Sequence, residues 1–386
     1  MADNNENKVL NVPLLRFPEF TDEWKESVLS DFVERVKRKN KNNLCKLPLT
    51  ISAQYGLVDQ ISFFNKVIAS ENMSNYYLLH KGDFAYNKSY SSEYPWGAIK
   101  RLDCYEQGTL SSLYICFKPY SHVSSDFLTH YFETSKWHQG ISEIAVEGAR
   151  NHGLLNVGIQ DFFETRHCLP QSLLEQEKIA KFLNLIEERI ATQNKIIEDL
   201  KKLKSAISER LFKSVKGSTV LLSDLCDIVK GKQINGENLS DSGNYYVMNG
   251  GTEPSGYYDN YNVEASTISI SEGGNSCGYV QFNTSPFWSG GHCYSIQNIA
   301  DKVDNMYLYH YLKSNEDAIM KLRIGSGLPN IQKKDLAMFK IIVPKIEWQI
   351  KISTFLSSLE RKAEIEERIQ NVMQKQKLYL LQQMFI

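Results

Sequence analysis

The chain contains the same long segment twice, each time shortly after a proline. One copy follows Pro170 and the other follows Pro344, and their apolar and polar positions stay in step without a gap as far as Phe212 and Phe385. These two phenylalanines are 173 residues apart, and the same offset holds along the segment. Repeats of solenoid proteins recur every roughly 20 to 50 residues. The sequence therefore predicts a duplicated domain and not a solenoid.

Both copies carry apolar residues at the alternating four- and three-residue steps of a coiled coil. The pattern continues for about 44 residues, or roughly 65 Å at 1.5 Å per residue, which is longer than a single small domain needs. Polar residues interrupt it at Gln193 and Lys204 in the first copy, and at the equivalent Glu366 and Lys377 in the second. Such residues specify register and partner at some cost in stability. We therefore expect the two helices to pair with each other, although each could instead pack only on its own domain.

The apolar seam is the expected interface of this helix pair and the candidate subunit interface. It comprises Ile179, Leu183, Ile186, Ile190, Ile197, Leu200, Ile207, Leu211, Ile352, Leu356, Leu359, Met373 and Leu380.

The duplication extends to the segments before the helices. Residues 29–32 (Leu-Ser-Asp-Phe) correspond to residues 222–225 (Leu-Ser-Asp-Leu), a pattern typical of a capped helix start. Residues 148–156 correspond in the same way to the glycine-containing residues 325–330. Between these anchors the two halves diverge almost completely. A common scaffold is therefore expected to carry two different surfaces.

Composition limits the class of protein. The chain has 386 residues, of which 42% are hydrophobic, and no apolar run approaches the roughly 18 to 20 residues of a membrane span. The polar N-terminal residues lack the pattern of a signal peptide, so we expect a cytoplasmic protein. Its seven cysteines are odd in number and never have a Cys-X-X-Cys spacing, which argues against a disulfide framework and against structural zinc. We expect them to be reduced and mostly buried.

The net charge of -1 does not by itself indicate a nucleic-acid-binding protein, so the distribution of charge has to be considered. Six cations and no acid lie within residues 35–46, and a weaker basic run follows Lys230. Loops rich in Asn, Ser and Lys follow the strand-like runs 83–86 and 268–270, and such side chains bind bases and phosphates. A solvated loop and ordinary turn chemistry explain the same composition.

Several common motifs of catalysis are absent from the sequence. It has no phosphate-binding G-x-x-x-x-G-K-[ST], no G-x-G-x-x-G and no H-E-x-x-H. The eight histidines are scattered without the spacing of metal ligands. If the protein takes part in an enzyme, another subunit carries the chemistry.

The order of the segments, two variable domains each followed by a proline and a long helix, resembles the specificity subunit of type I restriction-modification systems. Local motifs support the resemblance, namely residues 15–24 (L-R-F-P-E-F-T-D-E-W) and residues 169–180, which contain Leu-Pro and then E-Q-E-K-I-A. It covers the chain from about residue 12. Two departures are Trp348-Gln349, which replaces the Glu-Gln pair in the second copy, and Lys81-Gly82-Asp83, which has no clear match in the second half.

The resemblance implies an α+β fold with two α/β target-recognition domains, residues 12–165 and 217–343. The helices of residues 170–215 and 345–386 would act as the spacer, and a twofold relation between the halves would make them an antiparallel coiled coil. Each domain would recognise one half of a bipartite, asymmetric site on double-stranded DNA. The alternatives are a coiled-coil scaffold with two protein-binding domains, and a catalytic subunit with an unrecognised active site.

The resemblance also implies partners. Two methyltransferase subunits would use S-adenosylmethionine to methylate adenine, and two restriction subunits would use ATP and Mg²⁺, so that this chain needs no cofactor or metal. The candidate DNA-binding residues are Arg35, Lys37, Arg38, Lys39, Asn87, Lys88, Ser89, Tyr90, Arg150, Asn151, Lys230, Lys232, Gln233, Asn275, Ser276, Arg323 and Asn330.

Overall fold

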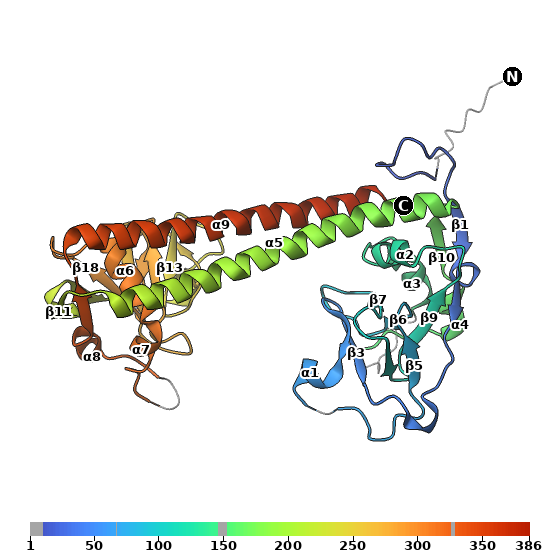
Figure 1. The fold of residues 1–386 in the computed structure, drawn as a ribbon, viewed down its shortest axis with the longest axis horizontal. Coiled ribbons are helices and arrows are strands. Elements are labelled where there is room, and N and C mark those ends of the chain that lie inside the picture. Colours follow the sequence, from blue (N-terminus) through green and yellow to red (C-terminus); the bar gives the residue numbers. More distant parts are fainter. Residues whose placement is uncertain (1–10, 67, 146–152, 326–328) are drawn as a thin grey trace. The chain divides into compact units, whose positions relative to one another are not determined.

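The computed structural model describes residues 11–66, 68–145, 153–325 and 329–386. It divides into two compact units, of which the first comprises Met1–Thr192 with Gln370–Ile386 and the second comprises Gln193–Ile369. Each unit contains part of both long helices, α5 (Leu173–Ser214) and α9 (Ile346–Gln383) (Figure 1). Both units combine small sheets with short helices, which confirms the predicted α+β class.

The first unit is built around a four-stranded antiparallel sheet. Its strands, in spatial order, are β2 (Val33–Arg35), β9 (Ile115–Pro119), β6 (Phe84–Asn87) and β7 (Ala98–Arg101). Three antiparallel pairs accompany it: β1 (Lys25–Val28) with β10 (Arg166–Leu169), β3 (Leu49–Ser52) with β4 (Gly56–Asp59), and β5 (Tyr77–His80) with β8 (Gln107–Leu110). The short helices are α1 (Gln60–Phe64), α2 (Ser125–Tyr131), α3 (His138–Ile144) and α4 (Ile159–Phe163).

The second unit repeats this plan. Its four-stranded sheet has the order β12 (Asp227–Lys230), β18 (Cys293–Gln297), β15 (Thr267–Ser271) and β16 (Val280–Asn283), and β11 (Ser218–Leu221) pairs with β19 (Lys340–Val343). A smaller sheet contains β14 (Tyr257–Tyr258), β13 (Tyr245–Met248) and β17 (Trp288–Ser289). The short helices are α6 (Asn305–Ser314), α7 (Glu316–Met320) and α8 (Lys333–Ala337). The strand-like runs expected at 83–86 and 268–270 are confirmed as β6 and β15.

A glutamine at the start of each long helix shows that the repeat extends to hydrogen bonds. Gln176 Oε1 accepts from the backbone N–H of Ser124, the N-cap of α2, at 2.8 Å. Gln349 Oε1 accepts from the N–H of Asp304, the N-cap of α6, also at 2.8 Å. Each glutamine also donates to the carbonyl of the proline that precedes its helix, at 2.8 Å. Both side chains are buried, so these bonds position each long helix on its unit.

One local prediction was wrong. The two Leu-Ser-Asp segments do not begin α-helices but form single 3-10 turns, Leu29–Asp31 and Leu222–Asp224. Each turn is short because the chain enters the four-stranded sheet soon afterwards, as β2 in one unit and β12 in the other.

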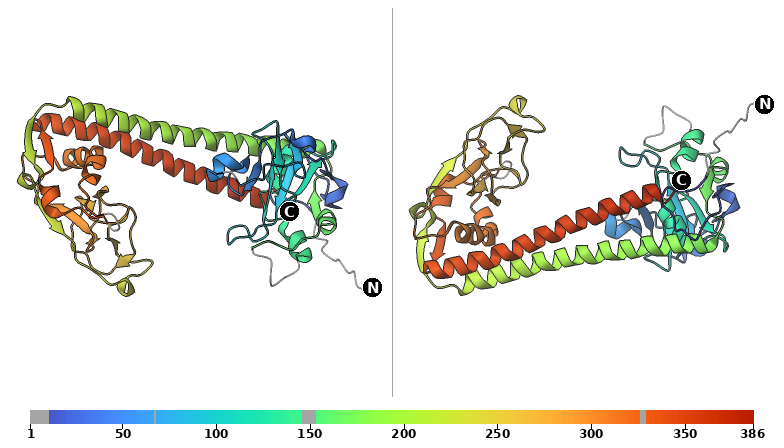
Figure 2. Two further views of the ribbon diagram at one scale, coloured as in Figure 1. Left: turned by 90° about the horizontal axis from the view of Figure 1, so that it is seen from below. Right: turned by 90° about the horizontal axis from the view of Figure 1, so that it is seen from above.

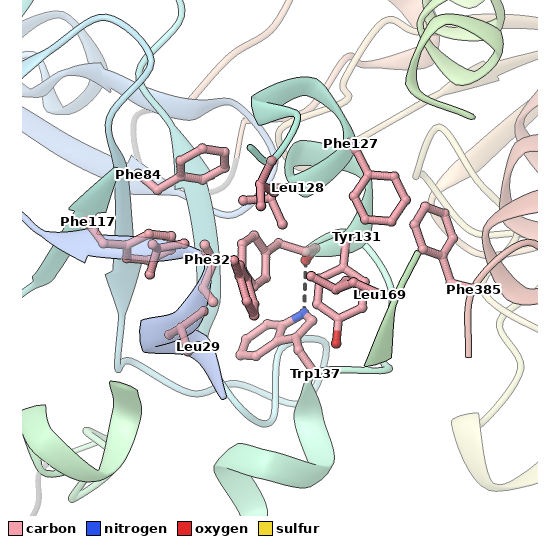
Figure 3. Close-up of a cluster of buried hydrophobic side chains, with 14 of the residues drawn as sticks. Leu29, Phe32, Phe84, Phe117, Phe127, Leu128, Tyr131, Trp137, Leu169 and Phe385 are labelled. Carbon is pink, nitrogen blue, oxygen red and sulfur yellow. Dashed lines mark hydrogen bonds between the residues drawn. The ribbon is translucent and has the colours of Figure 1, made fainter. Parts of the chain in front are cut away.

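An aromatic core fills the first unit between the four-stranded sheet, α2 and the start of α5. Figure 3 shows Phe385, which follows α9, against Phe127 and Tyr131 of α2, with ring centroids 5.3 and 6.1 Å apart. The buried indole of Trp137 donates to the carbonyl of Phe132 at 3.0 Å. In the second unit the equivalent Phe212 packs on tyrosines of α6. Truncating such a residue to alanine typically costs about 3–5 kcal/mol.

Within each unit a stretch of α5 lies beside a stretch of α9, as both views of Figure 2 show. In the second unit Gln193 donates to Glu366 Oε2 at 2.7 Å, and Lys204 pairs with Glu360 at 2.5 Å, so residue numbers rise along α5 as they fall along α9. In the first unit Lys377 pairs with Glu187 at 2.6 Å. The predicted antiparallel coiled coil is therefore confirmed, and its polar positions are joined by these pairs.

The seam residues serve the chain itself. Ile179 and Leu183 are buried in the core of the first unit, and Ile352 and Leu356 are buried in the core of the second. Ile190 and Ile197 are buried on the paired face of α5. These six residues therefore serve the packing within this chain, and a contact of the seam with another subunit stays a prediction.

The expectations from composition can also be compared with the structure. All seven cysteines are free thiols, and five of them are buried (Cys45, Cys116, Cys226, Cys277 and Cys293). Among the described residues, no helix combines the length and the apolar character that a membrane crossing requires.

A buried histidine predicts that the fold loses stability in acid. Burial lowers the pKa of His310 to about 4, and its Nε2 lies 2.9 Å from the hydroxyl of Ser357. In the unfolded chain the pKa is about 6.5, so the unfolded state binds the proton first as the pH falls below that value. The contribution is complete above about pH 6.5 and is lost towards pH 4, at up to about 1.4 kcal/mol per pH unit.

Thermal unfolding at pH 7 and pH 5 tests this. The melting temperature should fall between these values, and His310→Gln, whose amide can still bond Ser357, should reduce the fall. Replacing the exposed His122 by glutamine is the control and should leave the pH dependence unchanged. Equal pH dependence in the His310→Gln protein would contradict the assignment.

Candidate nucleic-acid interface

The two four-stranded sheets place the candidate loops at equivalent edges. In the first unit β2 and β6 both pair antiparallel with β9, so they run in the same direction and end at the same edge of the sheet. In the second unit β12 and β15 are related to β18 in the same way. The segments that follow these strands contain most of the candidate residues. Loops at one edge of a rigid sheet are a common site of binding.

In the second unit the structure brings the candidate segments together. The loop after β15 pairs with residues 329–331, because Gly273 forms a bridge with Asn330 and the Gly274 N–H donates to the Pro329 carbonyl at 3.0 Å. The segment after β12 lies against the segment before β18, where the Lys232 N–H donates to the Ser289 carbonyl at 2.9 Å. The candidates at this edge are all exposed or half-buried, namely Lys230, Lys232, Gln233, Asn275, Ser276, Arg323 and Asn330.

A buried carboxylate lies at the centre of this edge. Glu272 is 6% exposed, and its Oε1 accepts from Lys230 Nζ at 2.7 Å and from the hydroxyl of Tyr294 at 3.0 Å. Its Oε2 has no hydrogen-bond partner and lies 3.8 Å from Nδ1 of the exposed His292. Glu272 thus holds the ammonium group of Lys230 in place while leaving about half of that side chain in solvent, 53% by relative area.

Gly231 explains how the basic segment approaches the loop before β18. A Cβ at this position would lie 2.2 Å from the carbonyl oxygen of Gly290 and 2.4 Å from that of Ser289. Only glycine allows the two backbones to lie this close. This close approach fixes the backbone between Lys230 and Lys232.

In the first unit the cationic side chains of residues 35–39 differ in how strongly neighbouring residues hold them. Arg38 pairs with Asp83, which is 5% exposed. Burial raises the pKa of Asp83, while a bond from the His80 N–H and the nearby guanidinium of Arg38 oppose that rise. Lys39 Nζ donates to the Asn75 carbonyl at 2.9 Å and lies 3.8 Å from the centre of the Tyr77 ring. Arg38 and Lys39 therefore help to hold the local structure.

Arg35 and Lys37 are less constrained. The Arg35 guanidinium has a long contact of 3.5 Å with the Tyr77 hydroxyl, and the side chain is half-buried. Lys37 is exposed. These two are the better candidates for phosphate contacts.

The loop after β6 is the counterpart of the loop after β15. Ser89 forms a bridge with Leu154, and the Leu155 N–H donates to the Lys88 carbonyl at 2.9 Å. The Asn87 side chain accepts from the Ser89 N–H at 3.0 Å, while Ser89 and Tyr90 are exposed. Arg150 and Asn151, also predicted to bind DNA, lie outside the described residues.

The sequence prediction missed several residues that shape these edges. Glu272 pairs with Lys230, while Tyr294 and His292 lie beside Glu272, and Asn249 accepts from the His292 N–H at 3.2 Å. In the first unit Asp83 plays a similar part beside Arg38. An acid at the end of an apolar strand-like run was the available signal, since a buried carboxylate requires a cationic or hydrogen-bonding partner.

The described residues offer no site for a metal. Within residues 11–66, 68–145, 153–325 and 329–386, no group of three or more His, Cys, Asp or Glu side chains could hold an ion. The geometry of these edges suits the binding of a polar, anionic surface.

Comparison with known proteins relates the second half of the chain to a described family. Residues 216–375 match the family model described as the type I restriction modification DNA specificity domain. These residues are therefore similar to type I DNA specificity domains. The match covers β11 to most of α9, and it confirms the resemblance to specificity subunits that the sequence indicated.

Two proteins with related names match parts of this chain in sequence. A Mycoplasma genitalium protein named as a type I specificity subunit is 34% identical over 122 residues, which are 31% of this chain and 31% of that protein. A Mycoplasma pneumoniae protein with the same kind of name is 32% identical over 145 residues, 37% of this chain and 38% of its own length. The matched stretches therefore span about a third of these relatives.

The fold is shared along nearly the whole chain. The crystal structure of the type I restriction-modification S subunit from M. genitalium has a TM-score of 0.62 and 16% sequence identity, and the match covers 97% of this chain and 99% of that one. The structural match thus extends beyond the specificity domain to both units and both long helices.

Proposed function

We propose that this chain is the DNA-recognition subunit of a type I restriction-modification complex. Each unit would bind one half of a bipartite, asymmetric site through the sheet edge described above. The observation that carries the proposal is the equivalence of the two edges. They have the same topology, formed by β2 and β6 in one unit and by β12 and β15 in the other, but different side chains.

The difference between the edges has a physical consequence for specificity. Lys88 directly follows the last residue of β6, and Glu272 directly follows the last residue of β15. Cationic and amide side chains bind different base edges from those that a carboxylate binds. Two unlike surfaces on one scaffold suit a site whose two halves differ in sequence.

The catalytic chemistry would belong to partner subunits in the cytoplasm. Two methyltransferase subunits would bind S-adenosylmethionine and methylate adenine, and two restriction subunits would use ATP and Mg²⁺. Near-neutral charge supports this division, because a net charge of -1 leaves few phosphate contacts for tight binding by the chain alone.

Mapping methylated adenines in cells with and without the gene tests the proposal. A bipartite methylated sequence should be present with the gene and absent without it. The purified chain should have no methyltransferase activity until the methyltransferase subunit is added. Activity of the isolated chain, or an unchanged methylation map after deletion, would refute the proposed role.

The freest cations should bind phosphates. Replacing Lys37 and Lys232 by alanine should weaken binding by the assembled complex about equally for all DNA sequences, and should reduce the slope of log affinity against log salt by about 1 for each phosphate that is no longer neutralised. Binding measured between 50 and 200 mM salt checks this. Lys202→Ala, an exposed position on α5, is the control. An unchanged slope would mean that the two side chains are merely solvated.

A further inference from the structure

Residues 15–19 cover the start of α5 in the first unit. Both oxygens of the Glu175 carboxylate accept from Arg16, at 2.7 and 2.8 Å, and Glu175 is only 2% exposed. The rings of Phe17 and Phe182 meet edge to face with centroids 5.9 Å apart. Lys178 Nζ lies 4.7 Å from the centre of the Phe17 ring and also pairs with Glu19. This segment therefore contacts α5 through an arginine, an aromatic ring and an acid.

The equivalent positions of the second copy are uncovered. Adding 173 to 175, 178 and 182 gives Trp348, Lys351 and Phe355, all in the second unit. Trp348 is 59% exposed and Phe355 is 46% exposed. Lys351 Nζ lies 5.1 Å from the centre of the Trp348 ring. Positions three and seven apart lie on one side of a helix, so these three side chains form one surface, here called the α9 patch.

The connectivity of the second half explains why its own chain leaves the patch open. Residues 11–24 precede β1 in the first unit as an irregular segment, in which the Phe20 N–H closes a turn on the Phe17 carbonyl at 3.2 Å. In the second half α5 continues to Ser214 and β11 begins at Ser218. The three residues between them are too few to cross the patch, since each spans at most about 3.5 Å.

We propose that the α9 patch binds a segment of a partner protein that carries an aromatic side chain and, two residues later in a turn, a carboxylate. The ring would lie on Phe355 and beneath Lys351, as Phe17 lies on Phe182 and beneath Lys178. The acid would pair with Lys351, as Glu19 pairs with Lys178. The position of Arg16 would be taken by an apolar residue on Trp348, because no carboxylate is present there.

A second copy of this chain fits the patch poorly. Its residues 15–19 would place Arg16 against Trp348, where the two charge-assisted hydrogen bonds that the Glu175 carboxylate accepts from the guanidinium cannot form. Those residues are also already held in their own unit, where the Leu15 N–H donates to the Gln383 carbonyl at 2.9 Å. The inference requires a protein partner, as in the proposed function, but it does not depend on DNA recognition.

A peptide with the sequence of residues 11–24 provides the test. It is made in its natural form and with Arg16→Leu, labelled, and titrated with the full-length chain by fluorescence anisotropy without DNA. The Arg16→Leu peptide should bind at least roughly tenfold more tightly than the natural peptide, since a charged group left unpaired weakens binding. Trp348→Glu should reverse this preference, because the new carboxylate can pair with Arg16.

Two further variants decide where the peptide binds. Phe355→Ser should abolish binding of the Arg16→Leu peptide, whereas Leu113→Ser, at an exposed leucine of the first unit, should leave it unchanged. Circular dichroism confirms that each variant is folded. Failure of the Arg16→Leu peptide to bind at concentrations up to about 1 mM would overturn the proposal. Binding that survives Phe355→Ser, or an unaltered preference in Trp348→Glu, would overturn it as well.

Discussion

Replacing Gln233, Asn275 and Ser276 by alanine is expected to abolish recognition of one half of the DNA site and to leave the other half intact. These residues lie at one sheet edge of the second unit, and each well-placed interaction with a base is worth about 1–3 kcal/mol. Removing two such interactions should weaken specific binding by the assembled complex by roughly 10²- to 10⁴-fold. Binding to DNA with single mismatches in either half measures the effect.

The pattern of mismatches is what separates recognition from general weakening. In the variant, mismatches in one half of the site should carry no further penalty, while those in the other half should still reduce binding. Replacing Ser89 and Tyr90 in the first unit by alanine is the matched control and should give the opposite pattern. If both halves lose specificity together in either variant, the two edges do not act separately.

Lengthening both helices at matched positions is expected to lengthen the unread spacer of the DNA site. Repeating residues 193–196 in α5 and residues 366–369 in α9 adds four residues to each helix, at the level of the Gln193–Glu366 pair. The helices grow by about 6 Å and turn by about 40°. DNA rises about 3.4 Å per base pair and turns about 34°, so we expect the spacer to grow by one or two base pairs.

The methylation map of cells with this variant should therefore show the same two half-sequences further apart. Inserting residues in α5 alone is the control, because it shifts Lys204 away from Glu360 and should destabilise the helix pair. An insertion after Leu211 is unsuitable, since it displaces Phe212 from the core of the second unit. Retention of the original spacer at full activity would show that the helices do not set the spacing.

The sequence by itself was sufficient for the duplication and for the helix pair. An offset of 173 residues and sustained heptads indicate two equivalent long helices, because helical periodicity is local and survives in any context where the helix forms. The polar positions Gln193 and Lys204 and their counterparts also indicated where the pair is joined. In a coiled coil each position faces a position on the other helix. Polar residues at equivalent places in both copies of the seam therefore marked contacts between the helices, and the structure contains these contacts.

The tertiary structure alone decided which candidate residues are available. Arg38 and Lys37 are neighbours in one basic run, yet Arg38 pairs with the buried Asp83, 45 residues away, while Lys37 is exposed. Lys230 likewise meets Glu272 only because β12 and β15 end at the same edge of their sheet. Pairings of this kind depend on strand order and not on local composition, which is why a run of cations could not reveal them. The same reason explains the α9 patch, since its exposure follows from what the rest of the chain leaves uncovered.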